Sequence, residues 1–271
     1  MDELRSVQLK AEAAGSPEAE RERSNGPLLT VIVPAYNEAP RIANSLVRLD
    51  TLLRTAGVPA EILVVDDGST DSTRAQAEQV IGELNAGAVI GCSQNRGIGH
   101  AVRVGVHHSR GEWIVLASAD QDEDAAWFLD MVERGTCGQA DVVVGSKWHP
   151  GSDVEYPVHR WVMSYAYQHL VRLLLRLPVR DTQGPMLFRG DLGRRLFARV
   201  ATDGFAFSVE FLARVNREGA RIAELPITVR QTAKRGRRAV RSAFSMLVST
   251  VRITVRLRAD RQQGMKRGGN C

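Results

Sequence analysis

Two adjacent carboxylates follow an apolar run in the first third of the chain, where Asp66 and Asp67 come after Glu61–Val65. Neighbouring acids repel each other, so a pair at one point favours a binding role. We expect Asp66 to accept hydrogen bonds from the amides of the Gly-Ser-Thr turn that follows. Asp67 is expected to accept from an N–H group of a nucleotide base. A purely structural Asx turn is the alternative.

The segment Ser118–Asp124 reads Ser-Ala-Asp-Gln-Asp-Glu-Asp and carries the highest density of acids. A divalent cation that bridges a diphosphate prefers oxygen ligands and accepts two carboxylates from a tight turn. We expect Asp120 and Asp122 to bind Mg²⁺ or Mn²⁺. Glu123 and Asp124 are expected to begin the next helix, where acids complement the helix dipole. An EF-hand loop is excluded because its Gly and distal Glu do not follow at the required positions.

A third segment, Pro34-Ala-Tyr-Asn-Glu38, lies at the end of the apolar run that begins at Leu28. Its aromatic ring, Tyr36, is suited to stack on a base, and the carboxylate of Glu38 is suited to bind a ribose or a base edge. The alternative is a strand terminated by proline, with Asn37 as the N-cap of the following helix.

A fourth segment, Asn95–Arg103, opens a helix with two glycines in Asn-Arg-Gly-Ile-Gly-His-Ala-Val-Arg. Backbone amides at a helix start can bind diphosphate oxygens, and Arg96 or Arg103 can assist. A plain glycine-rich turn, with His100 packed on the sheet, is the alternative.

Unbroken apolar runs precede these segments, and they indicate how the segments are positioned. Such runs suit strands buried on both faces of a parallel sheet, and helical patterns lie between them. Strands alternating with helices predict βαβ units that bind ligands at the carboxyl ends of the strands. The predicted fold class is therefore α/β and Rossmann-like, with a mostly parallel central sheet flanked by helices. The expected strands are Leu28–Val33, Glu61–Val65, Ala88–Cys92, Glu112–Ala117 and Asp141–Val144, and the helices among them are Asn37–Thr55, Asp71–Leu84 and Ile98–Ser109.

The second half of the chain is less regular. A length of 271 residues with 44 % apolar residues fits one large domain with appendages. Three scattered cysteines form no metal-ligand spacing and indicate no disulfide scaffold. The expected elements are the helices Tyr156–Leu177, Asp191–Val200, Phe207–Glu218 and Ser242–Leu257, and the strands Arg221–Leu225 and Ile227–Arg230.

Charge is distributed unevenly along the chain. From Arg230 to Cys271 there are 12 Lys and Arg residues and one acid, a formal charge of +11, within a chain of net charge +5. We interpret residues 231–271 as a basic amphipathic tail for an anionic partner, with a solvated tail as the alternative. The tail lacks the interleaved aromatic residues that stack on single strands, so no nucleic acid partner is expected.

The amino-terminal segment 1–26 is poor in large apolar residues, so we expect it to be disordered. Its polar start lacks the apolar region of a signal peptide. No run approaches ~18 uninterrupted apolar residues, so we expect no transmembrane helix. These observations favour a cytoplasmic protein, peripheral to the cytoplasmic face of a membrane.

In combination, these segments resemble the inverting glycosyltransferases of family 2, which have the GT-A fold. The closest branch is that of the dolichyl- or polyprenyl-phosphate mannose synthases. The resemblance runs from about Leu29 to Arg230, so residues 27–230 are interpreted as the GT-A domain. It rests on Val33–Glu38, Val64–Asp71, Asn95–Gly99, Val144–Lys147, Asp181–Arg189, Phe207–Glu210 and Glu224–Ile227.

On the donor side, the resemblance implies a divalent metal and a nucleotide diphosphate sugar. Family members usually have Asp-Ala-Asp followed two residues on by Gln. The first of these aspartates is Ser118 here and the glutamine is Asp122, while Asp120 carries over directly. Lys147 stands where the family often has Arg, which keeps the charge but loses the bidentate fork. The donor positions so implied are Pro34, Tyr36, Glu38, Asp66, Asp67, Ser118, Asp120, Lys147, Arg230 and Lys234.

On the acceptor side, Asp181 and Gln183 match the loop that faces the sugar or the acceptor phosphate. Arg230 and Lys234 match basic positions that engage phosphates in this branch. A helix-breaking turn at Asp181 and a solvated tail at Arg230 are the alternatives. Asp120, Asp122, Asp181 and Gln183 are thus the expected catalytic positions.

The resulting hypothesis is transfer of a hexose, first of all mannose from GDP-mannose, to a polyprenyl or dolichyl phosphate with inversion. An acceptor phosphate needs no strong base, whereas an acceptor hydroxyl would need Asp181 or Glu210. The alternatives are a soluble glycosyltransferase for a small hydroxylated acceptor and a non-catalytic nucleotide or nucleic-acid binding protein. The tail is expected to lie on an anionic membrane surface or against a membrane partner protein, and a helix packed on the catalytic domain or on a partner is the alternative. Its expected lipid-facing side comprises Phe244, Leu247, Val248, Val251 and Val255, flanked by Arg241, Arg252 and Arg256.

Overall fold

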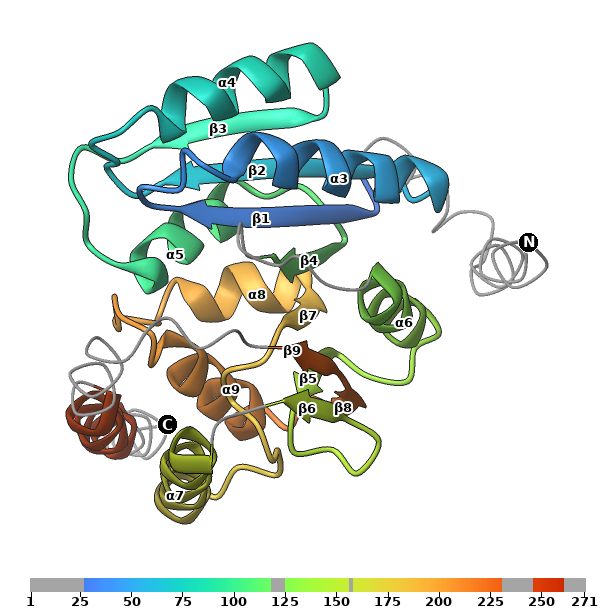
Figure 1. Ribbon diagram of the computed structural model, residues 1–271. Coiled ribbons are helices and arrows are strands. Elements are labelled where there is room, and N and C mark those ends of the chain that lie inside the picture. The colour runs from blue at the N-terminus through green and yellow to red at the C-terminus, as the bar shows by residue number, and fades with distance from the viewer. Residues whose placement is uncertain (1–26, 118–124, 156–157, 231–245, 261–271) are drawn as a thin grey trace, which may run out of the picture.

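The computed structural model describes residues 27–117, 125–155, 158–230 and 246–260 (Figure 1). Within these residues, a seven-stranded sheet has the order β3-β2-β1-β4-β7-β5-β8, and β6 and β9 form a separate pair. The predicted α/β class is therefore confirmed. The strands are β1 Leu29–Ala35, β2 Ala60–Asp66, β3 Gly87–Gly91, β4 Trp113–Leu116, β5 Val142–Ser146, β6 Asp153–Glu155, β7 Met186–Arg189, β8 Ile222–Pro226 and β9 Thr228–Arg230.

The directions of the strands determine which edge of the sheet could bind a ligand. β1 pairs in parallel with β2 and β4, β2 with β3, and β5 with β8. β7 alone in this sheet runs antiparallel, between β4 and β5. The carboxyl ends of the six parallel strands therefore share an edge with the start of β7, which follows the Asp181–Gln183 loop.

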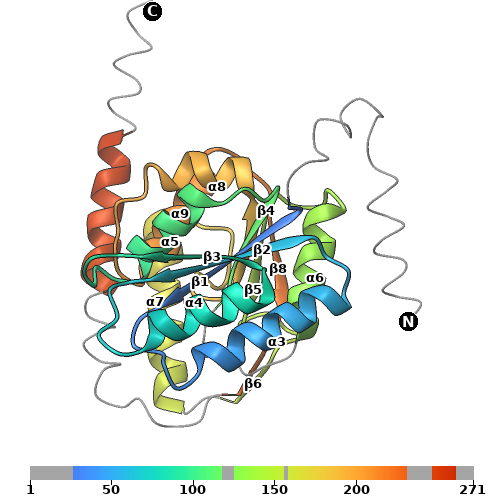
Figure 2. The same ribbon diagram turned by 90° about the horizontal axis from the view of Figure 1, so that it is seen from above.

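Helices cover both faces of the sheet (Figure 2). Alternate residues of β1 face opposite sides, because Val31 and Val33 pack in one core and Ile32 packs in the other. The first core contains α3 Ile42–Thr55, α4 Thr73–Leu84 and α6 Ala125–Thr136, and the second contains α5 Ile98–His108, α8 Gly190–Phe197 and α9 Phe207–Arg217. This two-faced burial explains why the strands are apolar without alternation.

The second core extends to α7 Val158–Leu175 and to a C-terminal helix at 246–260. Ile253 and Leu257 of this helix are buried in the same cluster as Val171 of α7. The hydroxyls of Tyr167 and Thr250 lie 3.0 Å apart and join the two helices. In the part of the chain that the structure describes, no helix has the length and apolarity needed to cross a bilayer.

The C-terminal helix adopts the alternative placement, packed on the catalytic domain. It does not stand apart as an amphipathic tail, because its Thr250, Ile253 and Leu257 face is buried on the α/β domain. The opposite face does carry exposed apolar residues, as the sequence predicted: Leu247, Val251 and Val255 are exposed. The helix therefore has one face in the core and one in contact with solvent.

Candidate functional site

The loops after β1 and β2 are joined by hydrogen bonds. The backbone N–H of Asn37 donates to Oγ of Ser69 at 3.0 Å, and Oδ1 of Asn37 accepts from the N–H of Thr70 at 2.9 Å. Asn37 has a left-handed φ of 54°, and α3 begins only at Ile42. Asn37 therefore does not cap α3. It ties the two loops together at the ligand edge of the sheet.

Tyr36 and Glu38 lie in this pair of loops. The ring of Tyr36 is 43 % exposed, as stacking on a ligand requires. The N–H of Glu38 donates to Oγ1 of Thr73 at 2.8 Å, and its Oε2 lies 3.0 Å from Nη2 of Arg41. Pro34 is in β1, in register with Val65 of β2.

Asp66 holds the turn that follows it. Its two carboxylate oxygens accept from the N–H of Ser69 at 3.2 and 3.3 Å. Gly68 lies inside this turn with a φ of +72°, and a Cβ there would lie 2.6 Å from the backbone of Gln94. Only glycine fits this conformation and this spacing. Asp66 thus has the turn-binding role predicted for it.

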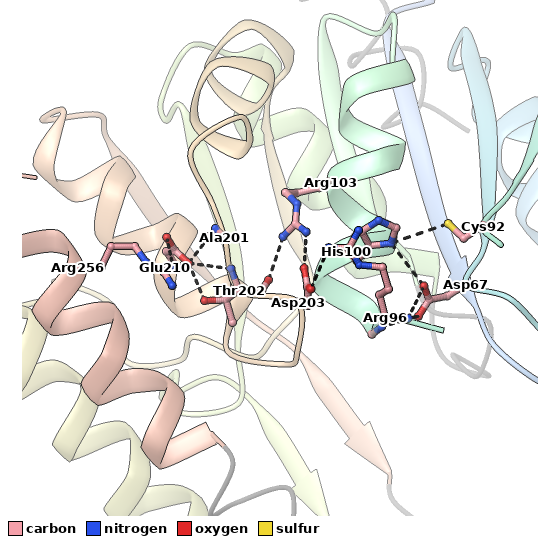
Figure 3. Close-up of polar contacts among 11 residues, drawn as sticks. Asp67, Cys92, Arg96, His100, Arg103, Ala201, Thr202, Asp203, Glu210 and Arg256 are labelled. Carbon is pink, nitrogen blue, oxygen red and sulfur yellow. Dashed lines mark hydrogen bonds and ion pairs between the residues drawn. The ribbon is translucent and has the colours of Figure 1, made fainter. Parts of the chain in front are cut away.

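Asp67 is buried, and its carboxylate holds the loop before α5 (Figure 3). Its Oδ2 accepts from the N–H of Gly97 at 2.7 Å, and both oxygens lie 3.2 Å from the N–H of Arg96. The N–H of Gly99 donates to the carbonyl of Asp203 at 2.7 Å. These three amides are therefore already bonded within the protein, which corrects the expectation that they receive diphosphate oxygens.

Asp203 is the second anchor of this loop. Its carboxylate binds Arg103 and accepts from Nη2 of Arg96 at 3.3 Å. Burial opposes ionisation of Asp203, but the hydrogen bonds and charges of Arg103 and Arg96 outweigh it, so its pKa lies below the ordinary value. Both arginines expected to assist a diphosphate thus form ion pairs with Asp203.

Lys147 and Asp181 form the centre of a second cluster at the same edge. Nζ of Lys147 lies 3.0 Å from Oδ2 of the fully buried Asp181. Oδ1 of Asp181 also accepts from Nε2 of Gln168 at 3.1 Å and from the N–H of Gln183 at 2.9 Å. Nε2 of Gln183 donates to Oγ of Ser208 at 2.9 Å. The structure thus brings together Lys147, Asp181 and Gln183.

Aromatic side chains border Lys147 on the α7 side. A small pocket beside it is lined by Trp148, Trp161, Val154 and Ser164. The Trp148 and Trp161 rings are 5.2 Å apart in an edge-to-face arrangement, and Trp161 stacks on Tyr165 at 5.3 Å. Nε1 of Trp148 is buried without a partner among the described residues. The ammonium group of Lys147 thus lies next to a wall of aromatic rings.

Glu210 is fully buried on α9 and is fully bonded (Figure 3). It accepts from the N–H groups of Ala201 and Thr202, and it pairs with Arg214 at 2.9 Å and Arg256 at 3.1 Å. Burial opposes its ionisation, but the Thr202 hydroxyl and both arginines outweigh it, so the pKa of Glu210 lies below its ordinary value. Its carboxylate is thus engaged within the protein, which argues against the general-base role considered for it.

Four of the predicted site residues lie outside the described residues: Ser118, Asp120, Asp122 and Lys234. The same holds for Glu123 and Asp124, expected to begin a helix, and for Arg241 and Phe244 of the expected lipid-facing helix. Ala117 follows β4 and directly precedes Ser118. Its N–H donates to the carbonyl of Ile32 in β1 at 3.0 Å. Arg230 lies in β9, in register with Glu155 of β6.

Sequence reasoning missed Asp203, Gln168 and Ser208. Each is a single polar residue in a helix or loop without a repeated pattern. Asp203 contacts Arg103 across 100 residues of sequence, so no local spacing predicts the pair. The Trp161 and Tyr165 spacing of four residues on α7 was the one available signal, since such residues share a helix face.

Comparisons with known proteins agree with this fold. The family Glycosyl transferase family 2 matches residues 30–196, and the chain belongs to that family. Glycosyltransferase AglD of Haloferax volcanii is 33 % identical over 73 % of this chain and 32 % of its own length. Dolichyl-phosphate beta-glucosyltransferase of Saccharomyces cerevisiae is 32 % identical over 74 % of this chain and 66 % of its own. The human protein of the same name is 33 % identical over 68 % and 61 %. The chain thus spans between about a third and two thirds of these relatives.

Solved structures confirm the GT-A architecture. Glucosyl-3-phosphoglycerate synthase from Mycobacterium tuberculosis, in complex with Mn²⁺, UDP and phosphoglyceric acid, superposes with a TM-score of 0.65 at 19 % identity. That match covers 88 % of this chain and 81 % of the other. Mannosyl-3-phosphoglycerate synthase from Rubrobacter xylanophilus has a TM-score of 0.66 at 18 % identity over 94 % and 81 %. At this identity the likeness establishes the fold.

Proposed function

We propose that this protein transfers a hexose, with inversion, from a nucleotide diphosphate sugar to a polyprenyl or dolichyl phosphate. The observation that carries the choice of acceptor is the state of Asp181 and Glu210. Both are buried carboxylates whose oxygens already accept hydrogen bonds from cations, amides or a hydroxyl within the protein, so neither is presented to an acceptor hydroxyl as a base. A phosphate acceptor is already anionic and needs only positioning, whereas a hydroxyl acceptor needs a base.

The sugar proposed here is glucose rather than the mannose first expected. The similar proteins from Saccharomyces cerevisiae and Homo sapiens are named as beta-glucosyltransferases. The structurally similar Mycobacterium tuberculosis enzyme was crystallised with UDP-Glc. UDP-glucose is therefore the first donor to test, and GDP-mannose is the second.

Donor binding is assigned to the edge formed by β1, β2 and β4. Tyr36 is exposed for stacking, and Asp67 keeps lone pairs on Oδ1 beyond its bonds to the α5 loop. Proposed donor contacts also include Pro34, Glu38 and Asp66 in the described loops, together with Ser118, Asp120, Arg230 and Lys234.

A divalent cation, Mn²⁺ or Mg²⁺, is assigned to Asp120 and Asp122. The donor set fits it, because hard cations prefer carboxylate oxygens, and the chain carries these two acids just beyond the carboxyl end of β4. When bound, such an ion neutralises charge on the departing diphosphate. The residues of this chain then orient the sugar and the acceptor.

The acceptor is assigned to the Lys147 pocket. Its ammonium lies at the boundary between the buried Asp181 and the aromatic wall of Trp148 and Trp161. A cation next to aromatic rings suits a phosphate joined to an apolar chain. Gln183, bonded to Ser208, holds the loop that borders this pocket. Lys147 is thus proposed to act on the acceptor side and to hold the phosphate near the sugar.

Peripheral contact with the cytoplasmic face of a membrane is also proposed. Exposed apolar side chains occur on α7, at Val158 and Val162, and on the neighbouring C-terminal helix, at Val251 and Val255. The basic C-terminal part of the chain complements anionic lipid headgroups. Arg256 takes no part in this contact, because it is bound to Glu210.

An acceptor and donor panel tests the proposal. Purified protein with Mn²⁺ is given UDP-glucose or GDP-mannose, with dolichyl phosphate or a short hydroxylated sugar as acceptor. We expect transfer to the lipid phosphate, and Lys147→Gln should raise the KM for the lipid at least tenfold with the donor KM unchanged. Lys147→Arg, which keeps the charge, is the matched control. Transfer to the hydroxyl acceptor alone would disprove the proposal.

A further inference from the structure

Three possible metal ligands converge beside the proposed donor site. Cys92 directly follows β3, His100 lies in the first turns of α5, and Asp67 directly follows β2. Sγ of Cys92 lies 3.9 Å from Nδ1 of His100, and that Nδ1 lies 3.6 Å from Oδ1 of Asp67. The three ligand atoms all lie within 4.8 Å of one another (Figure 3).

These separations are close to those of a tetrahedral cation site. Zinc bonds of about 2.3 Å to sulfur and about 2.0–2.1 Å to nitrogen and oxygen place the ligand atoms roughly 3.4–3.6 Å apart. The two distances between neighbouring atoms exceed this by only a few tenths of an ångström. Small side-chain rotations would therefore close the site around an ion.

Hydrogen bonding accounts for one of the two contacts, because Sγ of Cys92 and Nδ1 of His100, 3.9 Å apart, are within reach of a hydrogen bond to sulfur. At 3.6 Å, Nδ1 of His100 and Oδ1 of Asp67 are too far apart for a hydrogen bond. The Asp67 carboxylate is instead fixed by the amides of Arg96 and Gly97, which leaves Oδ1 aimed at the histidine ring. The Asp67 ligand is thus held in place by backbone amides, while His100 lies on α5 and Cys92 begins the loop after β3.

Charge and access favour a cation here. Burial raises the pKa of the Cys92 thiol, and the negative charges of Asp67 and Asp66, which a bound cation would offset, raise it further. The side chain of His100 is 15 % exposed and that of Asp67 is 4 % exposed, so the cluster is shielded but reachable from solvent. Three protein ligands with one open side match the pattern of a zinc site that retains a water.

We propose that Asp67, Cys92 and His100 form a binding site for a thiol-preferring divalent cation such as Zn²⁺. The ligand set separates it from the carboxylate pair Asp120 and Asp122, because thiolate and imidazole select zinc over magnesium and manganese. A cation here occupies Oδ1 of Asp67. The proposed function, on which this step rests, assigns the same carboxylate to the nucleotide base of the donor. Zinc and the donor therefore compete for Asp67.

Cobalt titration tests the site without any measure of activity. The background is Cys137→Ser with Cys271→Ser, so that Cys92 is the sole thiol of the chain. It also carries Asp120→Asn and Asp122→Asn, so that the carboxylate site proposed for Mn²⁺ or Mg²⁺ does not bind cobalt. We expect one Co²⁺ per chain, with tetrahedral ligand-field bands, a thiolate-to-cobalt charge-transfer band, and displacement by Zn²⁺. Cys92→Ser and, separately, His100→Gln should each weaken binding at least tenfold, with His108→Gln as the matched histidine control. Cobalt binding that is unchanged in both variants, or that is octahedral, would overturn the site.

Competition between Co²⁺ and the nucleoside of the donor is measured in a separate titration. Uridine and guanosine lack the diphosphate, so neither removes the metal from solution by chelation. We expect the nucleoside that matches the donor to raise the apparent Kd for Co²⁺. If cobalt binds in the predicted manner and neither nucleoside affects it, the cation site stands, and the competition and the role of Asp67 in donor binding are disproved. Absence of the cobalt bands would instead disprove the site and leave the proposed function intact.

Discussion

Arg256 of the C-terminal helix binds the buried carboxylate of Glu210, with Nη1 3.1 Å from Oε2. Glu210 also receives the amides of Ala201 and Thr202, and the next residue, Asp203, binds Arg96 and Arg103 of the α5 segment. Figure 3 shows that these contacts continue to Asp67. The C-terminal helix is therefore connected to the candidate donor site through consecutive polar contacts.

Arg256→Met should lower the free energy of unfolding by about 1–2 kcal/mol, because one hydrogen-bonded cation is lost while Arg214 still pairs with Glu210. Arg258→Met, on an exposed position of the same helix, should change it by less than about 0.5 kcal/mol. Urea unfolding of both variants measures the difference. Equal stabilities would show that the ion pair contributes nothing.

Acidification should destabilise the wild-type protein through Glu210. The pKa of Glu210 is lower in the folded state than its ordinary value of 4.5, so the unfolded chain binds more protons below that pH. The contribution is complete above pH 4.5 and is lost as the pH falls through the folded pKa. In Glu210→Gln the fall in unfolding free energy below this pH should be shallower. Parallel pH profiles would contradict the assignment.

Leu257→Ala should cost about 2–5 kcal/mol, since Leu257 is 1 % exposed in the core. Val255→Ala should cost less than about 0.5 kcal/mol, because Val255 is 63 % exposed on the other face. Thermal unfolding of the pair tests whether the C-terminal helix belongs to the domain. A neutral Leu257→Ala would mean that the helix is not docked in solution.

Gly68→Ala should be more destabilising than Gly57→Ala. Both glycines have a positive φ, but a Cβ at Gly68 would lie 2.6 Å from the backbone of Gln94, whereas nothing lies within 4 Å of one at Gly57. The left-handed conformation alone costs roughly 1 kcal/mol for alanine. Any additional loss of unfolding free energy in Gly68→Ala, measured by urea unfolding, comes from the close packing of the turn after β2. Equal costs would refute that packing.

Asp67→Asn should weaken donor binding by about 1.5–3 kcal/mol, because the proposed bond from the base to a charged acceptor is lost. Asp203→Asn is the matched control, since Asp203 supports the same loop from the other side without a proposed donor contact. Calorimetric titration with the donor compares them. An equal loss in both variants would assign the effect to the order of the loop rather than to Asp67.

The strands at the donor edge were predictable because their burial on both faces requires continuous apolar runs. β1 to β5 lie within about two residues of the predicted ranges. The insertion of β7 between β4 and β5 was not predictable, because a four-residue strand, Met186–Arg189, carries no information about its partners or direction. That strand nevertheless positions the Asp181–Gln183 loop.

The buried face of the C-terminal helix was difficult to predict because it contains threonines. Thr250 and Thr254 lie on its buried face, and their hydroxyls donate to the carbonyls of Met246 and Thr250 within the same helix. Once bonded in this way, a threonine packs as an apolar residue. The hydropathy pattern therefore identified the exposed Val251 and Val255 side of the helix but not the buried side.

The most direct measurement is the product formed from UDP-glucose, dolichyl phosphate and Mn²⁺ by the purified protein. Proton NMR of the purified lipid reports both the linkage and the configuration at the anomeric carbon. We predict a glucosyl phosphate of β configuration, inverted from the α-linked donor, and product formation at low lipid concentration that is at least tenfold slower after Lys147→Gln. A product of α configuration, or glucose transferred to hydroxyl groups while the lipid phosphate stays unmodified, would contradict it.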